Sequence, residues 1–401
     1  MLTPAEAEER ILAAMPPAAA EDCPLAEAQG RVLRSGLRAD RDLPPFDRAT
    51  MDGYALRTSA LAAGGRSFRI EAVQPAGQPA RALGSAADAC IEIMTGAPLP
   101  AGADAVVPYE ETEREGEVMT VAPGLALAPG NAIHRRGSDH RAGEIVVPAG
   151  IRLSGREIAV AAACGCPTVV VSRLPAIAVV ASGDELVEVT APVADHQIRR
   201  SNDYALRAAL VLAGYPRVER FHSRDEPAAL ADLLRRVLAE FDVVLLTGGV
   251  SRGRFDLIPA ELERQGVRKI LHGVAQRPGK PLWFGVGDRR QPVFALPGNP
   301  VSAYLCLHRY VLPALAASAG LTPGPRPRVP LAERFVFRPK LARFLPVRLR
   351  AGPGGGQEAV PVPGNTSGDF AGLVGTDGFV ELPAGTDEFP AGWLAPFWPW
   401  S

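Results

Sequence analysis

Residues 243–256 read VVLLTGGVSRGRFD, an apolar run that ends in a glycine-rich loop. The run 243–246 suits a buried strand, and Gly248 and Gly249 follow it almost directly. Two adjacent glycines let a backbone approach a ligand closely, and a helix expected over 257–265 would offer free N–H groups to an anion. The stretch has neither the Gly-Lys-Ser/Thr of a Walker loop nor a GxGxxG pattern. It predicts a phosphate-handling site at the end of a buried strand.

The same alternation of apolar runs and helical stretches continues on both sides of this loop. Apolar runs at 176–181 and 293–296 indicate two further buried strands, and helices are expected over 202–213, 227–240 and 301–319. Strands that alternate with helices of this length are typical of a parallel α/β sheet. Ligands bind such sheets at the carboxyl ends of the strands, which is where these loops lie.

Two more loops carry chemistry suited to anions. The RPGKP turn places Arg277 and Lys280 between apolar strands, as a compact clamp for an oxyanion. The loop LPGNPVS at 296–302 ends a strand and begins a long helix, which Asn299 or Ser302 could cap while its first turn presents N–H donors. A solvated surface turn is the alternative for RPGKP. Capping and anion binding are compatible in the second loop.

Carboxylates accompany these loops or occupy glycine-flanked turns. Asp256 follows the first loop, where it is a natural ligand for Mg²⁺ near phosphates or simply the cap of the next helix. Glu185 lies in an SGDEL turn at a strand end, and Asp225 precedes a helix start, where capping is the leading structural interpretation. In the N-terminal half, Asp52 and Asp139 are each equally suited to an Asx-turn.

Composition limits the class of protein. The chain has 401 residues, of which 47% are hydrophobic and 22% charged, so we expect a globular protein of several domains. A formal net charge of −1 gives no general attraction for nucleic acid or an anionic membrane. The N-terminus lacks the pattern of a signal peptide, and no apolar run is long enough to span a membrane. We therefore expect a cytoplasmic protein.

The five cysteines include no CxxC pair, which argues against a disulfide scaffold and a structural zinc site. For the close pair Cys164 and Cys166 we expect packing at a helix end, with redox or metal chemistry as the alternative. Outside the α/β part, residues 44–147 alternate short β-like runs with Gly and Pro turns, which predicts a β-rich module. Short strands after a proline-rich joint predict a C-terminal β domain. The fold class is therefore α/β plus β.

Six motifs, in this order, resemble those of the molybdopterin molybdotransferase family, which inserts molybdenum in the last step of molybdenum-cofactor synthesis. They are PPFDRATMDGYALR, IMTGAPLPAGADAVV, SGDEL, LLTGGVSRGRFD, RPGKPLWFG and LPGNPVSA. The resemblance covers residues 1 to about 320 and continues more weakly to the end. Six ordered motifs are far more specific than any one of them.

The resemblance implies an elongated, multi-domain homodimer with a central parallel α/β sheet domain. Four domains are implied: a linking helical domain (1–22, 40–52 and 141–173), a β-rich module (23–39 and 53–140), an α/β molybdopterin-binding domain (174–321) and a C-terminal β domain (322–401). The active site would lie between the α/β domain of one subunit and the β-rich module of its partner. Molybdopterin adenylyltransferase and molybdoenzyme-maturation proteins are the further partners that the resemblance suggests.

The implied reaction is Mg²⁺-dependent hydrolysis of adenylated molybdopterin, with transfer of molybdate onto the dithiolene and release of AMP. The catalytic positions that carry over by motif are Asp52, Thr95, Asp139, Glu185, Asp225 and Asp256, and Asp256 is also the expected metal ligand. The expected substrate-binding positions are Gly248, Gly249, Ser251, Arg277, Lys280, Pro281, Asn299 and Ser302. Lys280, Pro281 and Ser302 would lie near the molybdate.

Two departures from the family pattern concern charge. The family usually has Lys where this chain has Arg277, and a small apolar residue where it has Arg252; an arginine at 277 keeps the charge but differs in shape. In the last domain the motif match is loose, and Arg343 and Ser367 are weaker candidates for further oxyanion contacts.

Two other functions compete with the transferase. One is a gephyrin-like scaffold, which would need added interaction segments that the sequence does not show. The other is a nucleotide hydrolase or deamidase, because a similar α/β domain occurs in competence-damage proteins. The motifs that contain Asp52 and Thr95 disfavour the second.

Overall fold

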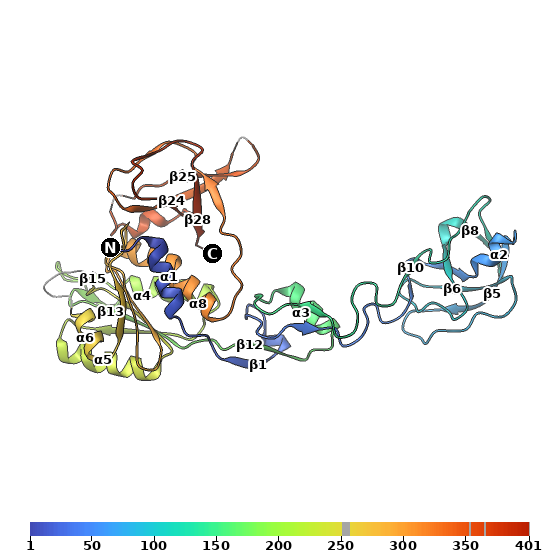
Figure 1. Cartoon of the computed structure of the whole chain (residues 1–401), viewed down its shortest axis with the longest axis horizontal. Helices are drawn as coiled ribbons and strands as arrows, with labels where there is room; N and C mark the ends of the chain where they lie inside the picture. The colour runs from blue at the N-terminus through green and yellow to red at the C-terminus, as the bar shows by residue number, and fades with distance from the viewer. Residues whose placement is uncertain (251–256, 353, 365, 401) are drawn as a thin grey trace.

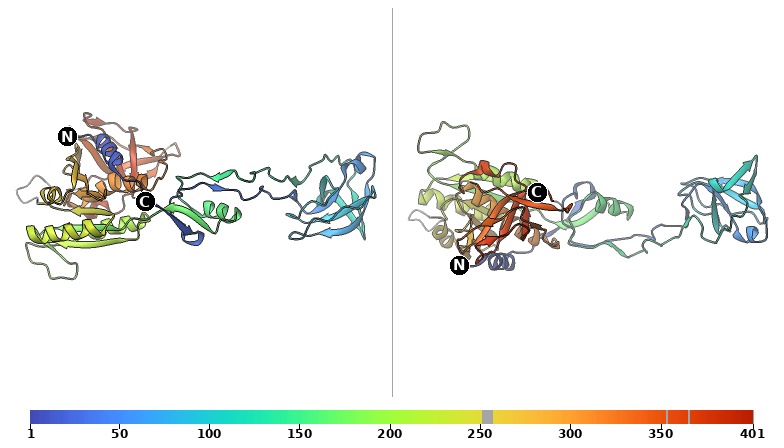
Figure 2. Two further views of the ribbon diagram at one scale, coloured as in Figure 1. Left: turned by 60° about the horizontal axis from the view of Figure 1, so that its bottom comes forward. Right: turned by 90° about the horizontal axis from the view of Figure 1, so that it is seen from above.

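The structure is a computed structural model that describes residues 1–250, 257–352, 354–364 and 366–400. The chain is elongated (Figure 1): the α/β and C-terminal domains lie together at one end, a small linking domain lies in the middle, and the β-rich module forms the other end. Two extended chain segments connect the linking domain to the module in both views of Figure 2. The expected multi-domain, elongated fold is confirmed.

A six-stranded sheet forms the core of the α/β domain, in the order β16-β13-β17-β21-β20-β18. The strands are β13 (Ile177–Ser182), β16 (Val218–Ser223), β17 (Val243–Thr247), β18 (Arg268–His272), β20 (Trp283–Val286) and β21 (Pro292–Leu296). The first four in the order are parallel, as expected, but β20 runs antiparallel to both of its neighbours, β21 and β18. The sheet is therefore mixed, because the short turn between β20 and β21 permits only a hairpin.

Helices cover both faces of this sheet. They are α4 (Asn202–Leu212), α5 (Pro227–Glu240), α6 (Ile258–Arg264), α7 (Pro300–Cys306) and α8 (Leu312–Ser318), with a π-helical stretch η3 (Leu307–Val311) between the last two. Successive residues of β13 point to opposite faces, as strand geometry requires. Val179 packs in the cluster that contains α4, α7 and α8, and Val180 packs in the cluster that contains α5 and α6.

The N-terminal helix α1 (Pro4–Ala14) packs on the α/β domain. Thr3 and Glu6 form a capping box at its start. Its buried Ala7 and Ile11 join the apolar cluster that contains β18 and α8. The assignment of residues 1–22 to the linking domain is therefore wrong for this helix, because its apolar face is buried on another domain.

The linking domain has its own core. It contains α3 (Gly155–Ala163), η1 (Leu25–Glu27), and two antiparallel pairs: β1 (Ala20–Pro24) with β12 (Thr168–Ser172), and β2 (Leu37–Arg38) with β11 (Ile145–Val147). Leu33 and Leu37 pack against Ala161 and Val171. Residues 23–39 therefore belong here and not to the β-rich module, since their apolar side chains are buried against α3 and β12.

Cys164 is buried at the end of α3, as predicted, and all five cysteine thiols are free. None of the helices in the described part of the chain is long and apolar enough to cross a membrane.

A six-stranded sheet in the order β7-β4-β6-β5-β9-β8 forms the β-rich module. Its elements are β4 (Gly53–Leu56), α2 (Thr58–Ala62), β5 (Ser67–Gln74), β6 (Ala89–Ile93), β7 (Ala105–Pro108), η2 (Tyr109–Glu111), β8 (Thr112–Glu115) and β9 (Val118–Val121). A short ribbon of β3 (Arg48–Ala49) and β10 (Ile133–His134) lies at its base.

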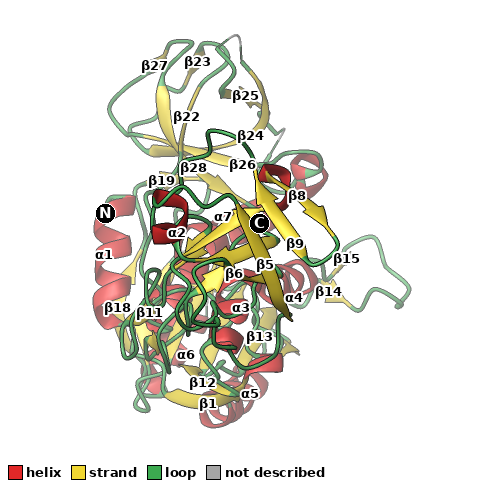
Figure 3. Cartoon of the chain, turned by 90° about the vertical axis from the view of Figure 1, so that its right-hand side faces the viewer, coloured by secondary structure: helices red, strands yellow, loops and turns green. Residues whose placement is uncertain are grey.

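The C-terminal β domain lies over the α/β domain (Figure 3). Its elements are β22 (Arg328–Pro330), β23 (Phe335–Val336), β24 (Ala342–Ala351), β25 (Gln357–Pro361), η4 (Phe370–Leu373), β26 (Gly378–Leu382), β27 (Glu388–Phe389) and β28 (Leu394–Pro399). One strand of the α/β domain, β19 (Gln276–Arg277), pairs in parallel with β24. The buried Arg309 also joins the two domains and α1, through ion pairs with Glu381 (2.7 Å) and Glu8 (2.9 Å).

Candidate functional site

A cavity of about 930 Å³ lies where the carboxyl ends of β13, β17 and β21 meet the C-terminal domain. This is the position at which open α/β sheets bind ligands. Nine expected residues of the α/β domain line it: Glu185, Asp225, Gly248, Gly249, Arg277, Lys280, Pro281, Asn299 and Ser302. Arg343 and Ser367 line it from the C-terminal domain. Loops distant in the sequence therefore meet in one place.

Gly248 lets the loop after β17 lie against the end of β13. Its φ is +95°, and a Cβ atom there would stand 2.4 Å from the carbonyl oxygen of Ser182. Any other residue would both strain the backbone and clash with a neighbouring strand. Gly248 is thus required by the geometry of the cavity wall, whereas the approach of the glycine pair to a ligand stays a prediction.

Three cations share one region of the cavity wall. In the parallel pair of β19 and β24, Arg277 is the register partner of Arg343, and Lys280 follows on the same turn as Arg277. Burial, and then the charge of Arg277, lower the pKa of Arg343 to about 10. Within the described ranges, no carboxylate forms an ion pair with any of the three, and Nε of Arg343 has no hydrogen-bond partner. An incoming anion would relieve this uncompensated charge.

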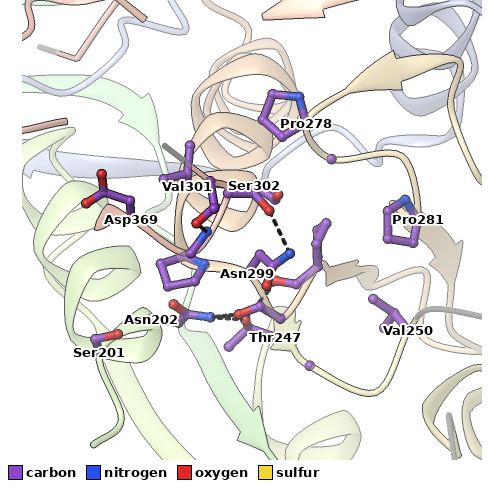
Figure 4. Close-up of a pocket in the computed structure, with 18 of the residues that line it drawn as sticks. Ser201, Asn202, Thr247, Val250, Pro278, Pro281, Asn299, Val301, Ser302 and Asp369 are labelled. Carbon is purple, nitrogen blue, oxygen red and sulfur yellow. Dashed lines mark hydrogen bonds between the residues drawn. The ribbon is translucent and has the colours of Figure 1, made fainter. Parts of the chain in front are cut away.

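Asn202, at the start of α4, is a site residue that we did not predict. Its side-chain Nδ2 donates to Thr247 Oγ1 (2.8 Å) and to the Gly298 carbonyl oxygen (2.7 Å), and so connects the loops after β17 and β21. In Figure 4, Asn202 and Thr247 lie between Ser201 on one side and Pro281 on the other. An Asn at a helix start is also an ordinary capping residue, so its sequence position did not point to the cavity.

Asn299 connects the two domains that form the cavity. It occupies the N-cap position of α7, but its side chain caps no helical N–H. Nδ2 of Asn299 instead donates to Ser367 Oγ (2.8 Å), and the Val301 N–H donates to the Ser367 carbonyl (3.1 Å). Of the two residues that could cap this helix, Asn299 therefore does not do so with its side chain, because the C-terminal domain provides its partner.

Asp225 and Glu185 bring carboxylates to the cavity. Ser182 Oγ donates to Asp225 Oδ1 (2.8 Å), which draws this carboxylate toward the end of β13. Glu226, not Asp225, occupies the N-cap position of α5. The capping interpretation of Asp225 is therefore wrong, and its carboxylate faces the cavity loops.

Asp52, Thr95 and Asp139 lie elsewhere, at the base of the β-rich module. Asp52 Oδ1 accepts hydrogen bonds from Thr95 N (2.6 Å) and Thr95 Oγ1 (2.7 Å), and these bonds lower the pKa of Asp52. Asp139 contacts His134 Nε2 at 2.9 Å. The module is at the far end of the same chain (Figures 1 and 2), so one subunit does not bring these residues to its own cavity.

Comparison with known proteins covers almost the whole chain. Residues 2–165 match the MoeA N-terminal region (domain I and II), 178–317 a probable molybdopterin binding domain, and 328–400 the MoeA C-terminal region (domain IV). A molybdopterin molybdenumtransferase from Synechocystis sp. is 38% identical over 372 residues, covering 92% of this chain and 93% of that protein. The chain belongs to the molybdopterin molybdenumtransferase family.

Further relatives agree with this assignment. A molybdopterin molybdenumtransferase from Synechococcus elongatus is 34% identical over 384 residues, which cover 94% of this chain and 93% of that protein. The crystal structure of the molybdopterin biosynthesis MoeA protein from Pyrococcus horikoshii OT3 matches with a TM-score of 0.84 and 26% identity, covering 99% of each chain. The family and the enzyme class expected from the six motifs are confirmed.

Six residues of the molybdenumtransferase motif LLTGGVSRGRFD, 251–256, lie outside the described residues; they include Ser251, Arg252 and Asp256. Across the ranges that the structure does describe, no group of three His, Cys, Asp or Glu side chains is placed to hold a metal ion. The expected roles of Ser251 and Asp256 therefore stay predictions.

Proposed function

We propose that this chain inserts molybdenum into adenylated molybdopterin, releases AMP, and so completes the molybdenum cofactor. The observation that carries this proposal is the facing pair Arg277 and Arg343 beside Lys280 in one cavity. Molybdate and the diphosphate of an adenylated pterin are both anions, and guanidinium groups bind oxyanions through two parallel hydrogen bonds. The cavity, at about 930 Å³, lies at the large end of the range for small-molecule sites, which suits two substrates held at once.

The residues of the wall divide between the two anions. Lys280 and Ser302 bind the molybdate, Pro281 lies beside it, and Arg277 and Arg343 are further oxyanion ligands. The backbone at Gly249 approaches the diphosphate, since a glycine leaves its N–H accessible to phosphate oxygens. The Gly248 N–H instead donates to the Leu296 carbonyl (3.4 Å), so Gly248 shapes the wall beside the diphosphate.

Mg²⁺ fits the carboxylates of this cavity. The ion keeps several waters and takes one or two protein carboxylates together with substrate phosphates. Glu185 and Asp225 line the cavity, and the sequence places Asp256 after the glycine pair that contributes to the same wall. Asp256 is the proposed ligand. When bound, the ion would neutralise charge on the phosphate oxygens from which AMP leaves.

A homodimer completes the site in this proposal. Asp52 and Thr95 are hydrogen-bonded to each other but lie on the module at the far end of the chain. A second subunit running in the opposite direction would bring its Asp52, Thr95 and Asp139 to the cavity of the first. Closed two-fold dimers are the commonest oligomers and would form two such sites.

The remaining partners follow from the chemistry. An adenylated substrate requires an adenylyltransferase upstream, and the completed cofactor requires a molybdoenzyme or a maturation protein downstream. We propose that the chain contacts both classes, in the cytoplasm, where five free thiols remain reduced.

One assay tests the proposed function. Purified protein is incubated with adenylated molybdopterin, Mg²⁺ and molybdate, and the products are followed as AMP and as activation of a cofactor-free molybdoenzyme. The proposal requires both products to appear, and molybdoenzyme activation to depend on molybdate. Folded protein that releases no AMP under these conditions would exclude it.

A further inference from the structure

Gln276 lies directly before the RPGKP turn, and its side chain is fully buried. Its Nε2 donates to the carbonyl oxygen of Gly279 (3.1 Å), so the side chain folds back beneath the turn that carries Lys280. The same nitrogen contacts Sγ of Cys306 at 3.5 Å, and Oε1 accepts the hydroxyl hydrogen of Tyr310. All the hydrogen-bonding capacity of the amide N–H₂ is therefore used inside the protein.

The contacts of Gln276 join two parts of the cavity wall. Cys306 is the last residue of α7, the helix whose first turn contains Ser302, and Tyr310 belongs to the π-helical stretch that continues it. The Gly279 carbonyl belongs to the peptide unit that leads into Lys280, and a planar peptide unit turns as one body. Gln276 thus fixes the cationic turn relative to the helix that begins at the cavity.

Close packing leaves the turn little freedom. Gly279 has φ +91°, and a Cβ atom on it would lie 2.6 Å from Cys306 Sγ and 2.7 Å from Gln276 Nε2. The Lys280 carbonyl is also held, by the Val274 N–H at 2.9 Å. The backbone of the turn therefore packs against the Gln276 side chain, whereas the Arg277 and Lys280 side chains are exposed to the cavity.

We propose that Gln276 is a positioning residue for the oxyanion site: it holds the Arg277–Lys280 turn at the spacing from Ser302 that molybdate binding requires. This inference rests on the proposed function. It assigns Gln276 no contact with the reacting atoms. A displacement of a binding group by about 1 Å can cost a large factor in affinity or rate, so loss of the Gly279 hydrogen bond affects the bound oxyanion first.

The test compares two buried glutamines. Gln276→Leu keeps a side chain of similar volume but removes the hydrogen bonds to Gly279 and Tyr310. Gln291→Leu is the matched control, because Gln291 is also buried and its amide also holds a backbone carbonyl, that of Leu238 at 2.8 Å, away from the cavity. Molybdate binding is measured by calorimetry on the full chain, together with the molybdate KM and the kcat of cofactor formation.

We expect Gln276→Leu to raise both the Kd and the KM for molybdate about tenfold, with a much smaller change in kcat, and Gln291→Leu to change neither constant. Tyr310→Phe keeps the Gly279 bond while loosening Gln276, and should weaken molybdate binding less but in the same direction. It is also the decisive variant if Gln276→Leu does not fold.

Unchanged molybdate binding in Gln276→Leu, or in Tyr310→Phe if that variant has to decide, overturns the positioning role and leaves the proposed function standing. Equal losses in Gln276→Leu and Gln291→Leu overturn it too, since they show a general loss of stability. Wild-type protein that neither binds molybdate nor releases AMP refutes the proposed function itself.

Discussion

Arg343 lies across from Arg277 on the paired strands β24 and β19, so that a largely buried guanidinium faces a second cation at the cavity. Burial is the main reason that the pKa of Arg343 falls to about 10, and the charge of Arg277 adds to it. Two such cations are unfavourable in the absence of an anion. We infer that the Arg277–Arg343 pair destabilises the unliganded protein, and that oxyanion binding offsets this loss of stability.

Replacement of Arg343 tests this interpretation. Arg343→Gln should weaken molybdate binding by at least about tenfold, because one charge-assisted contact is lost. It should leave the free energy of unfolding unchanged, or raise it by about 1 kcal/mol, since an unpaired buried charge is removed. Calorimetry and chemical unfolding measure the two effects.

Arg348→Gln is the matched control for Arg343→Gln, because Arg348 lies on the same strand, is exposed, and donates to the Gly375 carbonyl at 3.0 Å. It should alter neither the molybdate affinity nor the free energy of unfolding. A marked loss of stability in Arg343→Gln, with molybdate affinity intact, would show that Arg343 serves the fold and not the oxyanion.

Lys280 should act on molybdate more than on the pterin. Lys280→Ala removes a point charge from the turn, and we expect the molybdate KM to rise about tenfold while the KM for adenylated molybdopterin changes little. Lys269→Ala is the control, since Lys269 is an exposed lysine of the same domain that pairs with Glu263 at 2.6 Å. If the dependence on molybdate concentration is the same in Lys280→Ala and wild type, the assigned role is wrong.

His308 should make the fold sensitive to acid. It is buried between Tyr304 and Trp400, its Nε2 has no hydrogen-bond partner among the described residues, and burial lowers its pKa to about 4. As the pH falls from about 6.5 towards 4, the unfolded chain binds a proton that the folded chain does not, so stability is lost, by up to about 3 kcal/mol. Urea unfolding at pH 7 and pH 4.5 measures the loss.

Two histidine variants show how much of the acid sensitivity is due to His308. His308→Leu should reduce the difference in stability between the two pH values, and His196→Leu, at an exposed histidine, should preserve it. An unchanged difference in His308→Leu would assign the acid sensitivity to other groups.

Removal of Mg²⁺ should stop AMP release. The carboxylates at the cavity suit an ion that also binds substrate phosphates, so chelation should abolish AMP release and added Mg²⁺ should restore it. Asp256→Asn should raise the Mg²⁺ concentration needed for half-maximal AMP release by about tenfold. Full AMP release in the presence of excess chelator would contradict a metal requirement.

Much of the fold could be predicted because its signals are local. The apolar runs that became β13, β17 and β21 each precede a glycine-rich loop, and parallel strands bring such loops to one edge of a sheet. Arg277 and Lys280 could be selected because two cations on a Pro-Gly turn between apolar strands form a compact clamp for an oxyanion. Local pattern and global fold agree at these positions.

The remaining features depend on contacts between distant parts of the chain. Strands as short as β2 (Leu37–Arg38) show no periodicity, so residues 23–39 could not be assigned to the linking domain. The partner of Asn299 is 68 residues away, at Ser367, which made a local cap the simpler prediction. Gln276 and Asn202 acquire their roles only through side-chain contacts with other loops. The residue type at one position, and the sequence immediately around it, carry no information about partners that are distant in the chain.

In the proposed dimer, molybdenum insertion occurs at a site composed of the cavity of one subunit and the β-rich module of the other. The most direct test mixes Asp52→Asn with Lys280→Ala under conditions that exchange subunits. Cofactor formation is measured at a molybdate concentration well below the wild-type KM, where Lys280→Ala alone should retain only about a tenth of wild-type activity. Every hybrid dimer would then contain one wild-type site, so we predict recovery of about a quarter of wild-type activity. Verified hybrid dimers that recover no activity would contradict the shared site.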